Sequence, residues 1–442
     1  MRRIFGTDGA RGIANKEITA ELALRIGRAA GLKFKNKAPI IIGEDTRISS
    51  PMLRSAVSAG VASAGVAAIQ SGIIPTPAVS LLTYLNGFAA GIMVSASHNP
   101  IQYNGIKLFD HFGYKLSDEA EEEIEQFAEN TKQLPDGANV GRINFNENLK
   151  EQYIEHILKR FPIDLRGMKI AVDTAFGATY YTTPETLRRL GAQLFLYGNV
   201  PDGKRINVNC GSTNIETIQH ITKEVNADIG IAHDGDGDRV LAIDEKGVPL
   251  DGDEIMLIIA KYLKKKNKLS ADKVVGTVMS NMGVERAFNK AGITFLRAKV
   301  GDRYVLQKMQ ENNAIIGGEQ SGHIIILEES HTGDGLITAL YLLKIMKEED
   351  MPLSELRKGV VHFPQILLNV RVKDKKILND LKVQDFIDKE KKKLSNRERI
   401  VVRASGTEPL IRIMVEGKDK KEITEIAEKI KNFLEEAKQC AE

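Results

Sequence analysis

The chain has no tryptophan, only two cysteines and no long uninterrupted apolar run. Cys210 and Cys440 are too few for a disulfide framework and favour a reducing compartment. The N-terminus has no apolar core or cleavage site typical of a signal peptide. The weakly apolar region 66–96 is interrupted by Pro75 and Pro77, which argues against a membrane span. We therefore expect a cytoplasmic protein without a membrane segment.

A strong charge of one sign is also missing. The 62 basic and 59 acidic side chains leave a net charge of only +3 over 442 residues. No dense basic stripe interleaves with aromatic residues, so nucleic acid is not expected as a partner. The lysine runs 264–266 and 391–393 are typical of solvated helix ends. The length predicts about two to four domains.

Strands and helices are expected to alternate along most of the chain, which predicts an α/β fold with crossover helices. A helix is expected to begin at Ser50-Pro51, with the serine as N-cap. The last part differs, because it predicts a small α+β domain after a boundary near 360–370, with a helix over 376–393. A second boundary is expected in the polar stretch 130–150. The expected strands are 39–43, 92–95, 169–172, 193–197, 227–232, 240–243, 274–279, 314–317, 365–372, 399–402 and 411–415.

Three aspartates alternate with glycines in Asp234-Gly-Asp236-Gly-Asp238-Arg239. In an extended backbone, side chains at i, i+2 and i+4 face the same side, so three negative charges would crowd together. Such crowding needs a cation, and oxygen ligands without cysteine favour Mg²⁺ over Zn²⁺. The simpler alternative is an exposed acidic turn. An EF-hand is rejected because Arg239 stands at the position that requires glycine.

A second polar loop is Ser95-Ala-Ser97-His98-Asn-Pro100. Its small residues are expected to leave the Ser97 hydroxyl accessible, and His98 can assist proton movement or bind an anion. No acidic residue is placed in the sequence to orient His98, so a protease-type triad is not indicated. Lys107 follows shortly after as a candidate cation. The alternative without function is a serine-rich turn stopped by proline.

Two further loops offer groups that suit a sugar phosphate. The segment 317–323 contains Glu319 and Ser321, which can bind sugar hydroxyls, although a polar hairpin explains it about as well. The segment 403–409, with Arg412 after it, combines hydroxyls, glycine and arginines that match phosphate; a tight hairpin is the alternative. Each loop follows a strand-like run. Ligands bind at the carboxyl ends of strands in α/β sheets, so we expect one shared site.

A fifth loop, Phe5-Gly-Thr-Asp-Gly-Ala-Arg11-Gly12, is neither a Walker A loop nor a dinucleotide-binding fingerprint. With the other four loops, in this order, it makes the sequence resemble the α-D-phosphohexomutases over essentially its whole length. Within that superfamily the chain is most similar to the bacterial phosphoglucosamine mutases. That finer resemblance depends mainly on Phe5-Gly-Thr-Asp8, Glu319-Gln-Ser321 and Val300-Gly-Asp-Arg-Tyr304.

The resemblance implies an α/β fold with four domains around a central cleft. Three are expected to be similar mixed-sheet α/β domains, and the fourth a C-terminal α+β domain. The expected ranges are 1–150 with the phosphoserine loop, 151–252 with the metal-binding loop, 253–365 with the sugar-binding loop and 366–442 with the phosphate-binding loop.

The resemblance also implies roles for individual residues. Ser97 is expected to carry a phosphoryl group. The residues expected to hold Mg²⁺ are Ser97, Asp234, Asp236 and Asp238. Those expected in acid–base chemistry or charge stabilisation are Ser97, Arg11, His98, Lys107 and His323. Those expected to bind the substrate are Arg239, Gly301, Asp302, Glu319, Ser321, Arg403, Ser405, Gly406, Thr407 and Arg412.

The implied reaction interconverts glucosamine 6-phosphate and glucosamine 1-phosphate through a 1,6-bisphosphate, which also serves as activator. It would feed UDP-N-acetylglucosamine and cell-wall precursor synthesis. The implied partners are small sugar phosphates. The expected assembly is a homodimer. The alternatives are a phosphomannomutase or phosphoglucomutase with the same mechanism, a Mg²⁺-dependent sugar phosphatase and a non-catalytic sugar-phosphate sensor. Ala10, Tyr103 and Asn214 depart from the usual pattern without removing a proposed catalytic group.

Overall fold

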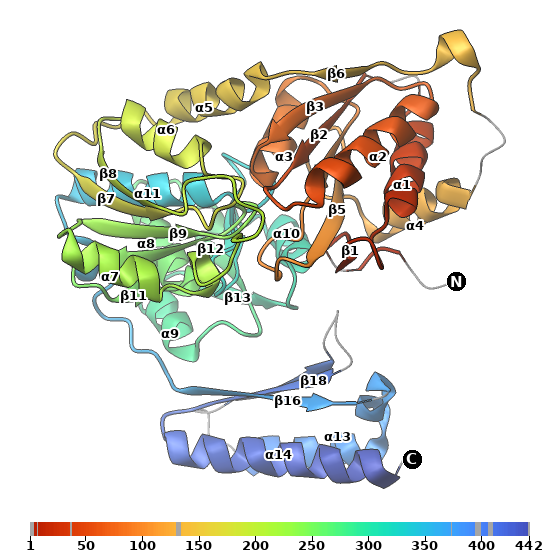
Figure 1. Cartoon of the computed structure of the whole chain (residues 1–442). Helices are drawn as coiled ribbons and strands as arrows, with labels where there is room; N and C mark the ends of the chain where they lie inside the picture. The colour runs from red at the N-terminus through yellow and green to blue at the C-terminus, as the bar shows by residue number, and fades with distance from the viewer. Residues whose placement is uncertain are drawn as a thin grey trace.

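The computed structural model describes residues 4–6, 8–35, 38–129, 134–372, 374–393, 399–404 and 410–440. These residues form four β-sheets, each with its own helices (Figure 1). The first three sheets combine parallel and antiparallel strands, and the fourth is antiparallel throughout. The expected fold, three mixed α/β domains followed by a smaller α+β domain, is confirmed.

The first sheet has the strand order β1-β5-β4-β2-β3-β6. Every residue of β2 and β4 is buried, and because successive residues face opposite sides, both faces of these strands are covered. The elements are β1 (Ala10–Ile13), α1 (Ala20–Lys33), β2 (Ile40–Glu44), α2 (Ser50–Ser63), β3 (Ala68–Ile73), α3 (Thr76–Leu85), β4 (Ala90–Val94), β5 (Tyr103–Phe109), α4 (Asp118–Glu129), the 3₁₀ turn η1 (Gly137–Asn139) and β6 (Ile143–Phe145).

Helix α2 corrects one expectation. Its N-cap is Ser49, and Ser50 is already its first helical residue. The Ser50 hydroxyl instead donates to Asp45 Oδ1 at 2.7 Å, inside the first domain. Tertiary hydrogen bonding has therefore displaced the expected cap.

The second and third sheets have the orders β11-β10-β9-β7-β8 and β13-β12-β14-β15. The elements of the second region are α5 (Asn148–Arg160), β7 (Lys169–Asp173), α6 (Thr182–Arg189), β8 (Gln193–Tyr197), η2 (Gly211–Thr213), α7 (Glu216–Glu224), β9 (Ile229–His233), β10 (Val240–Asp244) and β11 (Pro249–Leu250). Those of the third are α8 (Gly252–Lys265), η3 (Ser270–Asp272), β12 (Lys273–Thr277), α9 (Met282–Lys290), β13 (Thr294–Ala298), α10 (Asp302–Glu311), β14 (Ile316–Gly318), β15 (Ile324–Ile326), α11 (Gly335–Glu349) and α12 (Leu353–Leu356).

The fourth sheet, in the order β16-β18-β17, carries two helices on one face (Figure 1). Its elements are β16 (Gln365–Arg371), η4 (Lys375–Asn379), α13 (Leu381–Lys393), β17 (Arg399–Ala404), β18 (Leu410–Glu416) and α14 (Lys420–Cys440). The helix expected over 376–393 is thus shorter, because a 3₁₀ segment precedes it and Asp380 between the two is extended.

The four sheets share one feature that positions the site. In each sheet, an antiparallel hairpin encloses one of the polar loops of the sequence. The hairpins are β4–β5, β9–β10, β14–β15 and β17–β18. Each loop therefore lies at the carboxyl end of a strand, as the sequence predicted.

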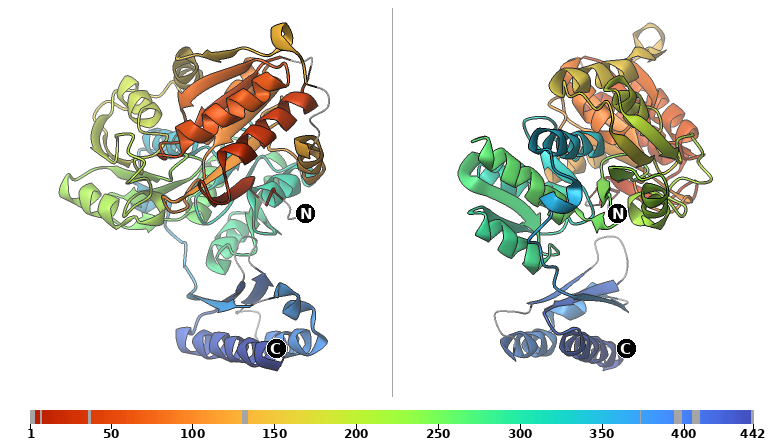
Figure 2. Two further views of the ribbon diagram at one scale, coloured as in Figure 1. Left: turned by 45° about the vertical axis from the view of Figure 1, so that its right-hand side comes forward. Right: turned by 90° about the vertical axis from the view of Figure 1, so that its left-hand side faces the viewer.

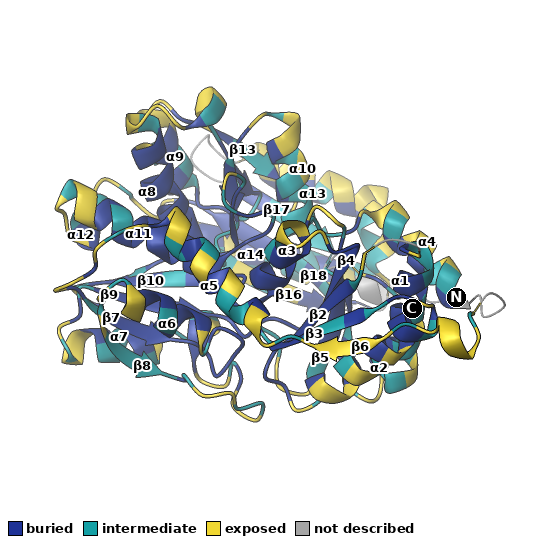
Figure 3. Cartoon of the chain, turned by 90° about the horizontal axis from the view of Figure 1, so that it is seen from above, coloured by how far each residue is buried: buried dark blue, intermediate teal, exposed yellow. Residues whose placement is uncertain are grey.

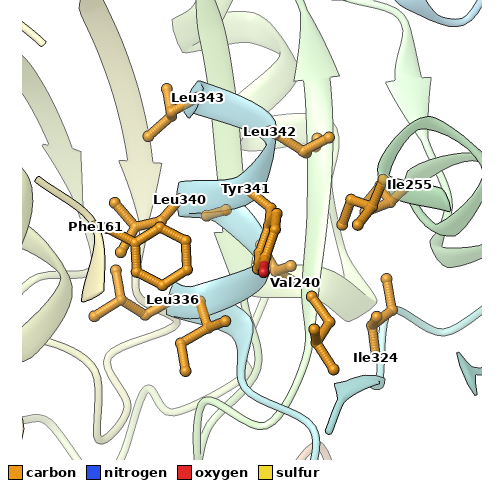
Figure 4. Close-up of a cluster of buried hydrophobic side chains, with 14 of the residues drawn as sticks. Phe161, Val240, Ile255, Ile324, Leu336, Leu340, Tyr341, Leu342 and Leu343 are labelled. Carbon is orange, nitrogen blue, oxygen red and sulfur yellow. The ribbon is translucent and has the colours of Figure 1, made fainter. Parts of the chain in front are cut away.

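One apolar cluster runs through domains one to three, and the first domain has a second cluster of its own. The apolar cluster of the fourth domain is separate from both. Helix α11 lies at the centre of the shared core and contacts side chains from the second and third regions (Figure 4). Its Tyr341 packs edge-on against Phe161, with ring centroids 5.2 Å apart. Exposed residues gather on outer surfaces such as one side of α5 (Figure 3). Because this apolar cluster joins the first three domains, we expect these domains to move little against one another.

The fourth domain lies apart from the other three and is joined by one extended segment (Figure 2). It is also hydrogen-bonded to the third domain: Met282 N donates to Glu416 Oε1 at 2.7 Å, and Arg399 Nη2 donates to Ser280 O at 2.8 Å. We propose the domain limits near 150, 252 and 365, with the first just before Asn148, where α5 begins. Among the described residues, no helix is both long and apolar enough to cross a membrane.

Candidate active site

Ser97 lies three residues after the end of β4, in the loop that leads to β5. Its backbone has φ +50°, a left-handed conformation that non-glycine residues seldom adopt. Its hydroxyl donates to Asp234 Oδ2 at 2.5 Å, across 137 residues of sequence. Only 1% of the residue is exposed, so the expectation of an accessible hydroxyl is wrong for this conformation. The second domain covers Ser97 because the aspartate loop packs onto it.

The three aspartates come together in a turn between β9 and β10. The turn, with Gly237 at φ +74°, replaces the extended backbone that the sequence suggested. The carboxylates still converge: one oxygen from each lies within 4.8 Å of the others. All three side chains are buried. Convergence without solvent makes their mutual repulsion severe.

These carboxylates fit a divalent metal ion. Asp236 Oδ1 and Asp238 Oδ1 are buried and have no hydrogen-bond partner among the described residues. Buried acceptors of this kind are costly unless a cation or a donor meets them. Three hard carboxylate oxygens are the ligand type that Mg²⁺ prefers. The three aspartates that the sequence predicted as metal ligands therefore form a candidate metal site.

Thr76 fixes the aspartate turn to the first domain, and sequence reasoning missed it. Its hydroxyl donates to Asp236 Oδ2 at 2.5 Å, and its backbone N–H donates to Asp236 O at 2.8 Å. A threonine at the first turn of α3 carries no distinctive sequence signal. Only the packing of two domains reveals its role.

Lys107, on β5, is the buried cation of the cluster. Its Nζ donates to Asp236 Oδ2 at 2.8 Å and to Asp238 Oδ2 at 3.3 Å, and it is 1% exposed. Burial alone would lower the pKa of Lys107, but Asp236, Asp8 and Asp238 raise it above its ordinary value. It therefore stays protonated and compensates part of the aspartate charge.

The carboxylates respond unequally to this environment. Burial raises the pKa of Asp234 well above its ordinary value, and the charges of Asp238 and Asp236 add to the effect. Burial also opposes ionisation of Asp238, yet Lys107 and His323 hold its pKa well below the ordinary value. Asp234 is therefore the carboxylate of the cluster whose ionisation a further cation would favour most.

The N-terminal loop contributes to a row of ion pairs beside the aspartate cluster. The sequence predicted only some of its members. Arg11 pairs with Asp8 and donates to Asn99 Oδ1 at 3.3 Å. Lys115 lies between Asp8, at 2.6 Å, and Asp302 of the third domain. Asp8 belongs to a motif already noted, but Lys115 follows an ordinary turn and has no such signal. This row of ion pairs ties the first domain to the third beside Ser97.

The surroundings shift the pKa values of the two histidines of the site in opposite directions. The positive charge of Arg239, with burial and Arg11, lowers the pKa of His98 to about 3, so its ring is neutral. Its Nδ1 lies 3.4 Å from Ser97 Oγ. Burial opposes protonation of His323, but Asp238 and Asp302 raise its pKa. Gly333 N donates to its Nε2 at 3.2 Å, which favours a ring proton on Nδ1.

His233, by contrast, is structural. Its two ring nitrogens are satisfied by Thr183 Oγ1, at 3.1 Å, and by Arg239 O, at 3.2 Å. Burial lowers its pKa to about 4, so the ring is neutral.

The third domain supplies the groups expected to bind sugar. Glu319 Oε1 accepts from Gly301 N at 3.0 Å, and Ser321 Oγ donates to Glu319 Oε2 at 3.5 Å. Asp302 begins α10 and pairs with Lys115. Glu319 and Arg239 interact electrostatically, so the sugar loop faces the aspartate loop.

The fourth domain presents two arginines. Arg403 and Arg412 are direct cross-strand neighbours on β17 and β18. They line a cavity of about 280 Å³ together with Met279, Asn369 and Met414. Burial and Arg412 lower the pKa of Arg403, whereas Glu319 of the third domain opposes this. Ser405, Gly406 and Thr407 lie outside the described residues.

Comparison with models of protein families identifies the family of the chain. Four domain models match: phosphoglucomutase/phosphomannomutase domains I, II and III over residues 2–135, 151–247 and 251–362, and the C-terminal domain over 367–433. The chain belongs to the phosphoglucomutase/phosphomannomutase family. The resemblance seen in the sequence is confirmed.

Curated relatives and solved structures match along the whole chain. Phosphoglucosamine mutases of Clostridium acetobutylicum and Desulforamulus reducens are each 48% identical, covering 98% of this chain and 99% of the relative. A phosphoglucomutase/phosphomannomutase family protein from Burkholderia thailandensis has a TM-score of 0.82 at 24% identity, covering 99% of this chain and 98% of that one. Aspergillus fumigatus N-acetylphosphoglucosamine mutase, solved with GlcNAc-6P and magnesium, has a TM-score of 0.70 at 18% identity, covering 98% and 96%. The two structures support the fold.

Proposed function

We propose that this phosphohexomutase is a phosphoglucosamine mutase, which interconverts glucosamine 6-phosphate and glucosamine 1-phosphate. The observation that carries the proposal is the 2.5 Å hydrogen bond from Ser97 Oγ to Asp234, inside a buried cluster of three aspartates and Lys107. A hydroxyl held against metal-ligand carboxylates suits reversible phosphoryl transfer. The choice of glucosamine follows the full-length phosphoglucosamine mutase relatives.

In the proposed mechanism, Ser97 carries the phosphoryl group as a phosphoserine. The O1 hydroxyl of the 6-phosphosugar attacks the phosphorus, the bond to Ser97 Oγ breaks, and a 1,6-bisphosphate forms. After the bisphosphate has turned around, Ser97 Oγ attacks the phosphorus of the 6-phosphate, the bond to O6 breaks and O6 takes up a proton. This step restores the phosphoserine and leaves the 1-phosphate. His98, which is neutral, is a candidate acceptor for the O1 proton. The bisphosphate is thus both intermediate and activator.

The negative charge of the phosphorylated site requires cationic side chains around it. A phosphoserine carries about −2 and three aspartates −3. Mg²⁺, held by Asp234, Asp236 and Asp238 with a phosphoserine oxygen, would contribute +2 and stabilise the negative charge that develops on the serine oxygen. Lys107, Arg239 and Arg11 lie around the cluster to meet the remaining roughly −3.

Glu319 and Ser321 are assigned to the sugar hydroxyls, with Gly301, Asp302 and Arg239 beside them. Arg403 and Arg412 are assigned to the phosphate that does not react, together with Ser405, Gly406 and Thr407. The separate core of the fourth domain supports a movement that would let the bisphosphate turn around. A cytoplasmic location and a homodimer stay predictions from the sequence.

The test compares kcat/KM for glucosamine, glucose and mannose phosphates with Mg²⁺ and a trace of hexose bisphosphate. The expected result is a clear preference for glucosamine phosphate and no release of free phosphate. Preference for glucose or mannose phosphate would support the phosphoglucomutase or phosphomannomutase alternative. Stoichiometric phosphate release would identify a phosphatase instead.

A further inference from the structure

Arg47 is a fully buried arginine behind the Ser97 loop. It follows β2, the strand next to β4, and has 0% exposure. Its Nε donates to Asp45 Oδ2 at 3.0 Å. Its Nη1 donates to the carbonyls of Pro100, 2.7 Å, and Tyr103, 3.0 Å, and its Nη2 to those of Ser97 and Asn99, both 2.8 Å. All five donors of the guanidinium are therefore used.

Four of these five bonds end on one short stretch of backbone, residues 97–103. This stretch connects β4 to β5 and contains Ser97 at φ +50°. A left-handed conformation at a serine costs about 1 kcal/mol or more and persists only where the surroundings impose it. Asn207 Nδ2 of the second domain donates to the carbonyls of Ser97, at 2.8 Å, and Asn99, at 3.5 Å. Arg47 binds these two and also the carbonyls of Pro100 and Tyr103, so it holds the stretch from one end to the other.

A second set of hydrogen bonds links Asp45 to the backbone N–H of Ser97 through the hydroxyl of Ser95. Asp45 Oδ2 accepts from Ser95 Oγ at 2.7 Å, and Ser95 Oγ accepts from Ser97 N at 2.9 Å. Asp45 therefore orients both Arg47 and the hydroxyl that holds the Ser97 amide. Among the described residues, the side-chain hydrogen bonds and ion pairs of Asp45 and Arg47 do not reach the three aspartates or the residues assigned to the sugar.

We propose that Arg47, oriented by Asp45, is a positioning residue that holds Ser97 in the conformation needed for phosphoryl transfer. The inference rests on the proposed function, because it gives the strained serine a reaction to serve. Arginine is required because four carbonyls and one carboxylate need a planar group with five donors. Lysine offers three donors at one point and cannot meet them.

The test is Arg47→Lys, with Arg54→Lys as the matched control. Arg54 lies in the same domain and pairs with Glu44 at 2.6 Å, but among the described residues its side-chain hydrogen bonds and ion pairs do not reach the Ser97 loop. Each protein is phosphorylated with glucose 1,6-bisphosphate, the phosphoserine is counted by intact mass, and transfer to glucosamine 6-phosphate is followed in a single turnover. The rate is expressed per phosphorylated molecule, so loss of folded protein does not enter it.

We expect R47K to lower the single-turnover rate by about 100-fold while KM for the sugar phosphate changes less than about twofold. R54K should keep the wild-type rate. A purely structural role predicts a lower melting temperature with an unchanged rate per phosphorylated molecule, and that result would overturn the inference. If R47K does not fold, Ser95→Ala decides: about a tenfold loss of rate supports the inference, and a wild-type rate overturns it. If the wild-type protein accepts no phosphoryl group at Ser97, the proposed function itself fails.

Discussion

Replacing Lys107 with methionine should destabilise the metal-free protein and make it depend more on a divalent cation. Lys107 is the buried cation nearest Asp236 and Asp238, at 2.8 Å and 3.3 Å. With an effective dielectric constant of about 20, these two contacts contribute about 6 and about 5 kcal/mol of attraction. Desolvation of the buried ammonium offsets several kcal/mol of this.

Removing one partner of such a buried cluster costs about 3–5 kcal/mol. An unfolding entropy of about 2.1 cal/mol/K per residue gives the 442-residue chain roughly 930 cal/mol/K if it unfolds as one unit. The melting temperature of K107M in EDTA should therefore fall by roughly 3–5 °C. Mg²⁺ replaces the lost charge, so it should raise the melting temperature of K107M more than that of the wild type.

The assay is thermal unfolding in EDTA and in Mg²⁺, by calorimetry or dye fluorescence. Lys246→Met is the control, because Lys246 is 63% exposed and lies 3.9 Å from Glu245. The free energy of unfolding of Lys246→Met should stay within about 0.5 kcal/mol of the wild-type value. K107M that melts at the wild-type temperature in EDTA, or gains no more from Mg²⁺ than the wild type, would refute the assigned role of Lys107.

Three further changes test the metal loop, the phosphate cradle and a buried carboxyl. Thr76→Val removes the hydroxyl that donates to Asp236 and should weaken Mg²⁺ binding about 10- to 100-fold by titration calorimetry, whereas unchanged affinity would contradict its role. Arg403→Lys should raise KM for the sugar phosphate about tenfold or more and change kcat less; a normal KM would argue against the cradle. Burial, with the charge of Asp251, raises the pKa of Asp253 to about 7. The folded state therefore holds a proton that the unfolded chain loses near pH 4, so stability is full below about pH 4 and falls as the pH rises through 7, by up to about 4 kcal/mol. Asp253→Asn should flatten this fall in denaturant titrations at pH 4–8, and an equally steep fall would contradict the assignment.

The sequence predicted the parts of the site that follow a local rule. Each polar loop comes after a strand, and strands of one sheet end at a shared edge, so Ser97, the aspartates and Glu319 were expected together. The crowded carboxylates followed from their spacing alone. Their backbone did not, because a turn at Gly237 achieves the same convergence as an extended strand.

The contacts that the sequence did not predict are those between elements distant along the chain. Arg47, Thr76 and Lys115 have no motif of their own, and their roles depend on which loops the folded domains bring beside them. The burial of Ser97 has the same origin, since the second domain covers it. The role of Ser50 was also set by a tertiary partner, Asp45.

The most direct test of the central claim joins product analysis to the chemistry of Ser97. The protein is incubated with glucosamine 6-phosphate, Mg²⁺ and a trace of hexose bisphosphate, and its mass is measured before and after. We predict glucosamine 1-phosphate as product, one phosphoryl group located on Ser97, and loss of both in Ser97→Ala. Isomerisation by Ser97→Ala at the wild-type rate, or wild-type protein that forms no glucosamine 1-phosphate, would contradict the account.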